Sequence, residues 1–117
     1  MKPAVDNFLP LAPATLHILL SLAGEKMYGY AIMQEVARQS EGRFKLGPGT
    51  LYDNLQRLMK QGLVEEVAGR PEEDNSRRRY YRLSGLGRGV LTAEIDRLRD
   101  VIDHAQAHLK PLRATRT

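Results

Sequence analysis

Apolar residues recur at helical spacing in two successive segments near the start of the chain. In residues 13–23 leucines lie three or four positions apart, Pro13 suits the first turn of a helix, and Gly24 ends the pattern. The same periodicity returns in residues 28–40, where Ile32, Met33, Val36 and Ala37 recur at helical spacing among polar side chains. The pattern predicts two amphipathic helices.

A third helix is predicted from Pro48 to Gly62. Proline is favoured at the first position of a helix, and glycine just past its last turn. Gly47 stands where a Ser or Thr would cap this helix, which weakens its start by roughly a few tenths of a kcal/mol. Between the two ends, apolar side chains at helical spacing predict a buried stripe made of Leu51, Leu55 and Leu58.

Two short segments that follow the third helix favour extended structure. Residues 63–67 and 80–83 are rich in valine, leucine and tyrosine. The intervening residues 68–79 contain glycine, proline and asparagine, which do not continue either strand. We therefore expect a two-stranded β-wing.

The last helix is predicted to begin after Ser84, a favourable N-cap, and to end at Pro111. Its apolar positions follow a heptad spacing, and the predicted seam consists of Leu91, Ile95, Leu98, Ile102, Ala105 and Leu109. Because three helices and a wing already complete a globular unit, the seam is expected to lack a partner within the chain. We therefore predict a homodimer.

These elements define the expected fold class: mainly α with a small β-wing, as a winged helix-turn-helix followed by a C-terminal dimerisation helix. The expected division of the chain is a flexible N-terminal arm over residues 1–12, a winged helix-turn-helix domain over 13–83, a dimerisation helix over 84–110 and a disordered tail over 111–117.

Composition narrows the functional classes. The 117 residues suit one domain, and the formal net charge of +4 with a pI near 9.6 permits a polyanionic partner. The chain contains no cysteine, so a disulfide framework and a thiolate zinc site are excluded. The sequence displays neither an apolar run long enough for a membrane helix nor a signal peptide, so we expect a cytoplasmic protein without a membrane partner.

The third helix carries polar side chains that suit nucleic-acid contacts. Asparagine and arginine fit the edges of adenine and guanine, whereas threonine and lysine suit phosphates. An ordinary solvated helix face is the alternative interpretation of such a pattern. The candidates on or just before this helix are Lys45, Thr50, Tyr52, Asn54, Arg57 and Lys60, with Tyr52 a secondary candidate that also suits a core or rim role.

Consecutive arginines precede the second strand of the predicted wing. Strand alternation would send Arg78 to one face, and Arg77 and Arg79 to the other. The acidic residues 72–74 oppose phosphate binding at the tip of the wing, so contact is expected at the start of the strand. A solvated charge cluster is the alternative.

Catalytic and cofactor motifs are not apparent in the sequence. His104 and His108 have a metal-ligand spacing but no third ligand, and the glycines at 85, 87 and 89 match no nucleotide-binding loop. We find no paired carboxylates and no nucleophile in a suitable context. We expect no enzymatic activity, no cofactor and no metal.

The motifs along residues 14–87 resemble those of the PadR family of bacterial transcriptional regulators. The resemblance rests on the tripeptide Tyr28 to Tyr30, on residues 49–52 with Leu55, Arg57 and Leu58, on residues 62–64 and on residues 79–84 with Gly87. Tyr28 departs from the family pattern, in which histidine is frequent. With one closing helix, the chain is similar to the shorter branch of the family.

The resemblance implies a winged-helix dimer, usually a repressor, that is joined through its C-terminal helical region and reads DNA with the third helix and the wing. Some relatives bind phenolic acids or drugs at the dimer interface. This chain has no tryptophan and only two phenylalanines, so a flat aromatic effector would lack an evident stacking partner.

The hypothesis is a homodimeric, sequence-specific regulator that binds double-stranded promoter or operator DNA as two half-sites. A small-molecule effector that changes the packing of the two C-terminal helices would change the angle between the two winged-helix domains of the dimer. The alternative is a winged helix that serves only as a protein-interaction module, in which the seam binds a different partner and the wing arginines are solvated.

Overall fold

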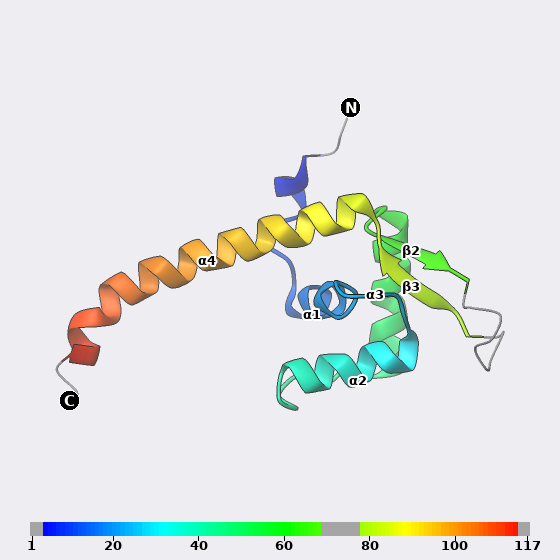
Figure 1. The fold of residues 1–117 in the computed structure, drawn as a ribbon, viewed down its shortest axis with the longest axis horizontal. Helices are drawn as coiled ribbons and strands as arrows, with labels where there is room; N and C mark the ends of the chain where they lie inside the picture. Colours follow the sequence, from blue (N-terminus) through cyan, green and yellow to red (C-terminus); the bar gives the residue numbers. More distant parts are fainter. Residues whose placement is uncertain (1–3, 69–77, 115–117) are drawn as a thin grey trace.

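The computed structural model describes residues 4–68 and 78–114, with side chains as far as residue 109. Three helices, α1 (Pro13–Ser21), α2 (Gly29–Gln39) and α3 (Pro48–Lys60), form a compact body together with a small sheet. The long helix α4 (Gly85–Ala114) crosses this body and projects well beyond it (Figure 1). The molecule is therefore elongated, with principal extents of 58 × 39 × 24 Å.

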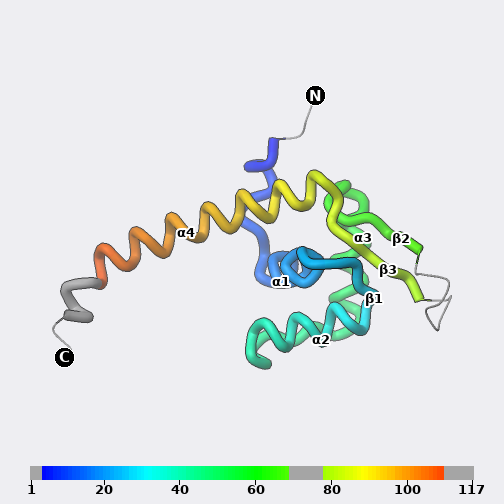
Figure 2. The backbone as a smooth tube through the Cα atoms, viewed as in Figure 1, coloured from blue at the N-terminus to red at the C-terminus, as the bar shows by residue number. Residues whose placement is uncertain are grey.

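The sheet contains one strand more than the sequence predicts. Strands β2 (Val64–Val67) and β3 (Tyr80–Leu83) form the expected antiparallel pair. Strand β1 (Met27–Tyr28) adds to the other edge of β3, which gives the order β1-β3-β2 (Figure 2). The prediction of a two-stranded wing was wrong in this respect, because a two-residue strand before a helix leaves no alternating pattern of its own.

The predicted end of α3 and the predicted start of α4 are confirmed. Gly62 has a φ of +79°, and the Leu63 N–H donates to the Leu58 carbonyl at 2.9 Å, so the chain leaves α3 through a left-handed glycine. The Ser84 hydroxyl accepts the Gly87 N–H at 2.9 Å and donates to the Gly62 carbonyl at 2.6 Å. Ser84 therefore caps α4 and ties its start to the end of α3.

The core contains the predicted leucine stripe of α3. Leu51, Leu55 and Leu58 are at most 1% exposed, and they pack with buried side chains of α1, α2 and both wing strands. The buried tyrosine Tyr81 contributes from β3. The wing is thus part of the core and holds a fixed position relative to α3.

The first half of the α4 seam lies against its own chain, contrary to the prediction. Leu91 belongs to the core and Ile95 packs against it, because α1 and the N-terminal segment lie along this part of α4. Beyond Leu98 the described side chains are exposed. The helix also continues past Pro111 to Ala114 instead of ending there, and residues 115–117 of the predicted tail lie outside the described residues.

The N-terminal segment is attached to α4. A 3-10 helix, η1 (Val5–Phe8), packs on α4, and the Leu11 N–H donates to Glu94 Oε2 at 2.9 Å. Glu94 is 1% exposed, and Arg97 donates to its two oxygens at 2.6 and 3.0 Å. The N-terminal segment therefore lies on the surface of the domain. It is held there by the buried Glu94 carboxylate, which no sequence pattern indicated.

The Glu94 carboxylate makes stability depend on pH. The Arg97 guanidinium holds the pKa of Glu94 below its ordinary value of 4.5, against the opposing effect of burial. The ionised carboxylate thus stabilises the fold above pH 4.5, and this contribution is lost as pH falls through the lower folded-state pKa. Glu94→Gln should cost about 2 kcal/mol at neutral pH. Denaturant unfolding of both proteins should show this difference narrowing below about pH 4.

The control for this prediction is Asp96→Asn, which removes an exposed carboxylate from the same helix and should leave stability nearly unchanged across the pH range. An equal effect of Glu94→Gln at neutral and acid pH would contradict the proposed role of the charge.

Among the helices of residues 4–68 and 78–114, none is long and apolar enough to cross a membrane. In the same ranges, no three histidine, aspartate or glutamate side chains are grouped to hold a metal ion. His104 and His108 are exposed on the projecting part of α4.

Candidate nucleic-acid interface

The outer face of α3 lies opposite the leucine stripe. Asp53, Gln56 and Lys60 are exposed and spaced three and four residues apart, so they form one row on the helix surface. This row is polar and carries one charge of each sign with an amide between them. It presents groups that can donate to and accept from base edges and phosphates.

Asn54 does not lie on this outer face, so the prediction that its side chain is available to contact DNA was wrong. Its side chain is 7% exposed and accepts a hydrogen bond from the Thr15 hydroxyl at 3.2 Å. Its amide nitrogen donates to the Thr50 carbonyl at 2.8 Å. A buried amide needs such partners, and Asn54 uses them to join α3 to α1 rather than to meet a base.

Arg57 lies at the edge of α3 that faces α1. Its Nη2 donates to Asn54 Oδ1 at 2.5 Å. The side chain also lines a cavity of about 260 Å³ beneath the N-terminal segment, together with Phe8 and Leu11. Arg57 is exposed but is held to the side of the outer row.

The arginines at the start of β3 have different surroundings. The Arg78 guanidinium lies over the Tyr28 ring, 4.2 Å from its centroid. Arg79 is 73% exposed, with its Nε 3.9 Å from Glu66 Oε2. Arg82, further along the strand, is paired with Glu65 at 3.0 Å. Arg77 lies outside the described residues. Of the described wing arginines, Arg82 therefore has the shortest ion pair, and the Arg79 side chain is largely exposed.

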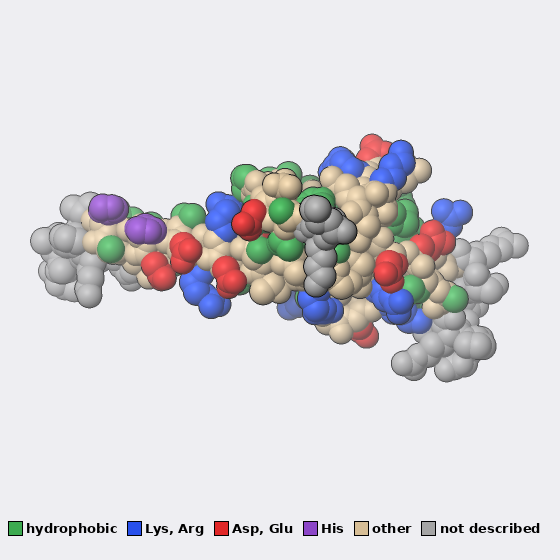
Figure 3. Space-filling view, turned by 90° about the horizontal axis from the view of Figure 1, so that it is seen from above, with side chains coloured by type: hydrophobic (Ala, Val, Ile, Leu, Met, Phe, Trp, Pro, Cys, Tyr) green, Lys and Arg blue, Asp and Glu red, His purple; other side chains and the backbone are tan. Residues whose placement is uncertain are grey.

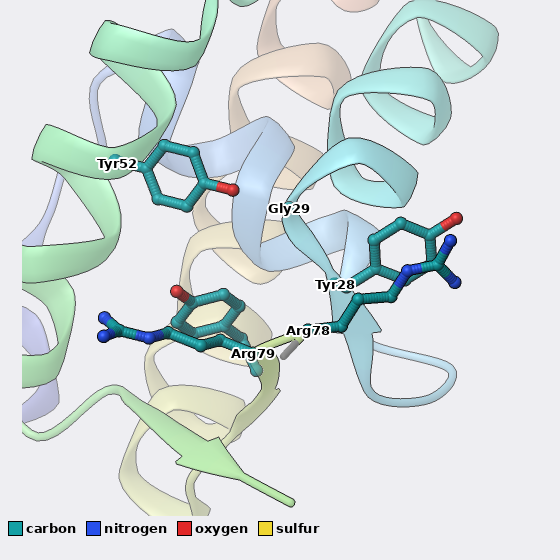
Figure 4. Close-up of a pocket in the computed structure, with 6 residues that line it drawn as sticks. Tyr28, Gly29, Tyr52, Arg78 and Arg79 are labelled. Atoms are coloured by element: carbon teal, nitrogen blue, oxygen red, sulfur yellow. The ribbon is translucent and has the colours of Figure 1, made fainter. Parts of the chain in front are cut away.

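A cavity of about 340 Å³ lies where the starts of α2 and β3 meet the side of α3 (Figure 4). We call it the tyrosine–arginine notch, and its lining residues are Tyr28, Gly29, Tyr52, Arg78, Arg79 and Tyr81. Tyr52 reaches from α3 with its hydroxyl directed toward Gly29, whereas Arg78 and Arg79 run in opposite directions from the start of β3 (Figure 4). The notch joins three elements that are distant in sequence.

The remaining predicted contact residues are accessible. Lys45 is exposed in the loop before α3, and Thr50 is exposed in the first turn of that helix. Tyr52 is 47% exposed, so it occupies the rim of the notch and not the core. Lys60 is the last residue of α3 and the last member of the outer row.

Comparison with known proteins decides the family. The model of the transcriptional regulator PadR-like family matches residues 18–93, which is more than half of the chain. The chain belongs to the PadR-like family. It is also 36% identical over 83 residues to the transcriptional regulator Rv3488 of Mycobacterium tuberculosis, an alignment that covers 71% of this chain and 73% of that protein.

Solved structures of PadR regulators have the same fold. A PadR family transcription regulator from Clostridium difficile matches with a TM-score of 0.71 and 23% identity, over 84% of this chain and 99% of that one. Bacillus subtilis PadR in complex with operator DNA matches with a TM-score of 0.62 and 17% identity, over 74% of this chain and 48% of that one. These matches confirm the predicted winged-helix architecture.

Three residues of the candidate interface were not among the site residues predicted from the sequence. Gln56 belongs to the outer row, and the periodicity of the leucine stripe was a sufficient signal to find it. Gly29 and Tyr81 line the notch, but no local pattern signals their position. Both reach it through the pairing of β1 with β3, which aligns Tyr28 with Tyr80 and Met27 with Tyr81.

Proposed function

We propose that this PadR-like protein is a cytoplasmic, homodimeric repressor that binds specific double-stranded DNA. In this proposal α3 enters the major groove, with Thr50 and Lys60 on the helix and Lys45 just before it. Arg78 and Arg79 contact the backbone beside it. Repression follows when the dimer occupies a promoter.

The observation that carries the proposal is that α3 lies next to the arginines at the start of β3. Tyr52 of α3 and the wing arginines Arg78 and Arg79 line one cavity, so the proposed base-reading helix and the cationic segment are adjacent. A cationic strand beside a polar helix face suits a groove and its flanking phosphates. The operator complex of Bacillus subtilis PadR, which has this fold, is consistent with such a use.

The dimer is proposed to form through the projecting half of α4. Val101, Ile102 and Leu109 are each at least 50% exposed, and with Leu98 and Ala105 they follow one face of the helix. Figure 3 shows charged and histidine side chains on other parts of this projection. This part of α4 projects beyond the core of its own chain, so its exposed apolar stripe is a surface that association with a second copy would bury.

The direct test is binding of the purified protein to duplex DNA from upstream of its own gene and to an unrelated duplex. Fluorescence anisotropy at several salt concentrations separates specific from nonspecific binding. Tight binding to the upstream duplex alone supports a regulator. Equal, weak binding with the same salt dependence would contradict recognition of that site, and a monomeric protein that binds neither duplex would favour the interaction-module alternative.

Lys60→Ala tests the outer row of α3. Because Lys60 is exposed at the end of this row, its loss should spare the fold and weaken binding to the specific duplex by about tenfold. The matched control is Arg99→Ala, which removes one positive charge from an exposed position on α4. Anisotropy titrations should place the control near the wild type. Equal effects of the two substitutions would mean that only net charge matters.

A further inference from the structure

The projecting half of α4 carries two histidines that neither the fold nor the proposed function uses. His104 and His108 are both exposed. Within the described part of the chain, neither side chain makes a hydrogen bond, an ion pair or a ring contact. The third histidine, His17, lies on α1 and stacks on the Phe44 ring, with 5.0 Å between the ring centroids. The two imidazoles of α4 are therefore available to a ligand from solvent.

The two histidines lie on one face of the helix. Residues four positions apart are neighbours on a helix surface, with about 5–6 Å between their Cβ atoms. Figure 3 shows two histidine side chains beside each other on the described part of the projection. A helix uses this spacing to present two imidazoles to one metal ion. His104 and His108 can therefore chelate an ion without a change in the backbone.

The charges around the pair favour a cation. From residue 100 to residue 109 the charged side chains are Asp100 and Asp103, and this stretch contains no lysine or arginine. Both aspartates are exposed, and Asp100 precedes His104 by four residues, which places it on the same face of α4. An ion held by the imidazoles thus meets no fixed positive charge in this stretch, and the carboxylates attract it.

Two imidazoles from one chain do not complete a metal site. Zn²⁺ takes four ligands in a tetrahedron when its site is closed. Within the described ranges no third histidine, aspartate or glutamate is grouped with the pair, which is why one chain alone predicts no metal. His108 follows Ala105 by three residues and directly precedes Leu109, so it lies at the edge of the apolar stripe. A second copy that covers the stripe therefore brings its own side chains beside His108.

We propose that His104 and His108 chelate a divalent transition-metal ion of the Zn²⁺ class, and that side chains of a second copy complete its coordination. The second half of this proposal rests on the association through α4 put forward under the proposed function, whereas the chelation does not. Imidazole and carboxylate groups, which this half of α4 carries, are the donors that a second copy offers. The bound ion would join the two copies and strengthen their association.

The test of chelation is a calorimetric titration of the untagged protein with zinc chloride. Magnesium chloride serves as the comparison, because Mg²⁺ prefers oxygen ligands and should not bind. His108→Gln leaves one imidazole on the face and should weaken Zn²⁺ binding by about a hundredfold, since the second ligand no longer acts at a high effective concentration.

The matched control for this titration is the double substitution Gln106→His with His108→Gln. It keeps two exposed histidines in the same stretch but separates them by two residues, which places them on opposite sides of the helix. The control should bind Zn²⁺ as weakly as His108→Gln alone. A control that binds as tightly as the wild type would overturn chelation by the pair.

The contribution of a second copy is tested by sedimentation across a dilution series with and without Zn²⁺. The ion should lower the dissociation constant of the dimer by about tenfold or more, because it binds the dimer better than the monomer. His108→Gln should remove this shift. Zn²⁺ that binds without changing the dissociation constant would overturn completion by a second copy. A wild type that stays monomeric with and without Zn²⁺ would contradict the proposed dimer, and the titration would still decide chelation.

Discussion

Replacing Gly87 with alanine is expected to destabilise the folded chain by about 3 kcal/mol. A Cβ atom at this position would lie 2.0 Å from the Leu63 carbonyl oxygen, which is backbone and cannot turn aside. That oxygen accepts the Ser84 N–H at 3.0 Å, so moving α4 away would also break the contact that starts the helix. Thermal unfolding should show a melting temperature lower by roughly 10 °C.

Gly85→Ala is the matched control for this prediction. Position 85 is also in the first turn of α4, but a Cβ atom there would meet no atom within 4 Å. Because alanine favours a helix more than glycine does, the control should be neutral or more stable by up to about 1 kcal/mol. Similar melting temperatures for the two variants would show that Leu63 and α4 are not in close contact.

Replacing Ile102 with aspartate is expected to abolish dimerisation and to weaken binding to a two-site operator by about a hundredfold or more. The side chain is 53% exposed, so the monomer fold should survive. A charge on the apolar stripe of α4 would have to be buried without a partner in the dimer, at a cost that association does not recover. Light scattering after size exclusion measures the mass, and anisotropy measures the affinity.

Ala107→Asp serves as the control on the same helix. Position 107 is exposed on the face of α4 opposite the apolar stripe, so the added charge should leave the mass and the affinity unchanged. A wild type that is already monomeric, or an Ile102→Asp variant that remains dimeric, would contradict association through this stripe. The latter result would direct attention to another surface of the chain.

Most of the framework of this protein was predictable because its signals are local. Proline at the start of α3, a left-handed glycine after its end and a serine before α4 each act within a few residues. The leucine stripe of α3 follows from periodicity alone, and all three of its members are buried.

The errors concern contacts between distant segments. The heptad in α4 correctly marked an apolar stripe, but periodicity does not tell which partner covers it. The structure divides the stripe between its own core, which takes Leu91, and a free portion around Ile102. The attachment of the N-terminal segment could not be predicted either, because it depends on Glu94, a residue 83 positions away from its partner Leu11.

The order of helices and wing strands, the arginines that precede β3 and the family of the chain all follow from the sequence alone. Which polar side chains of α3 are accessible depends instead on how the elements pack together. Asn54 lies inward because α1 brings the Thr15 hydroxyl to it, and Tyr52 lies above Gly29 because β1 pairs with β3. Local periodicity determines the face of a helix on which a side chain lies. Whether that side chain is buried, and which distant residues it contacts, depends on how the elements pack against one another.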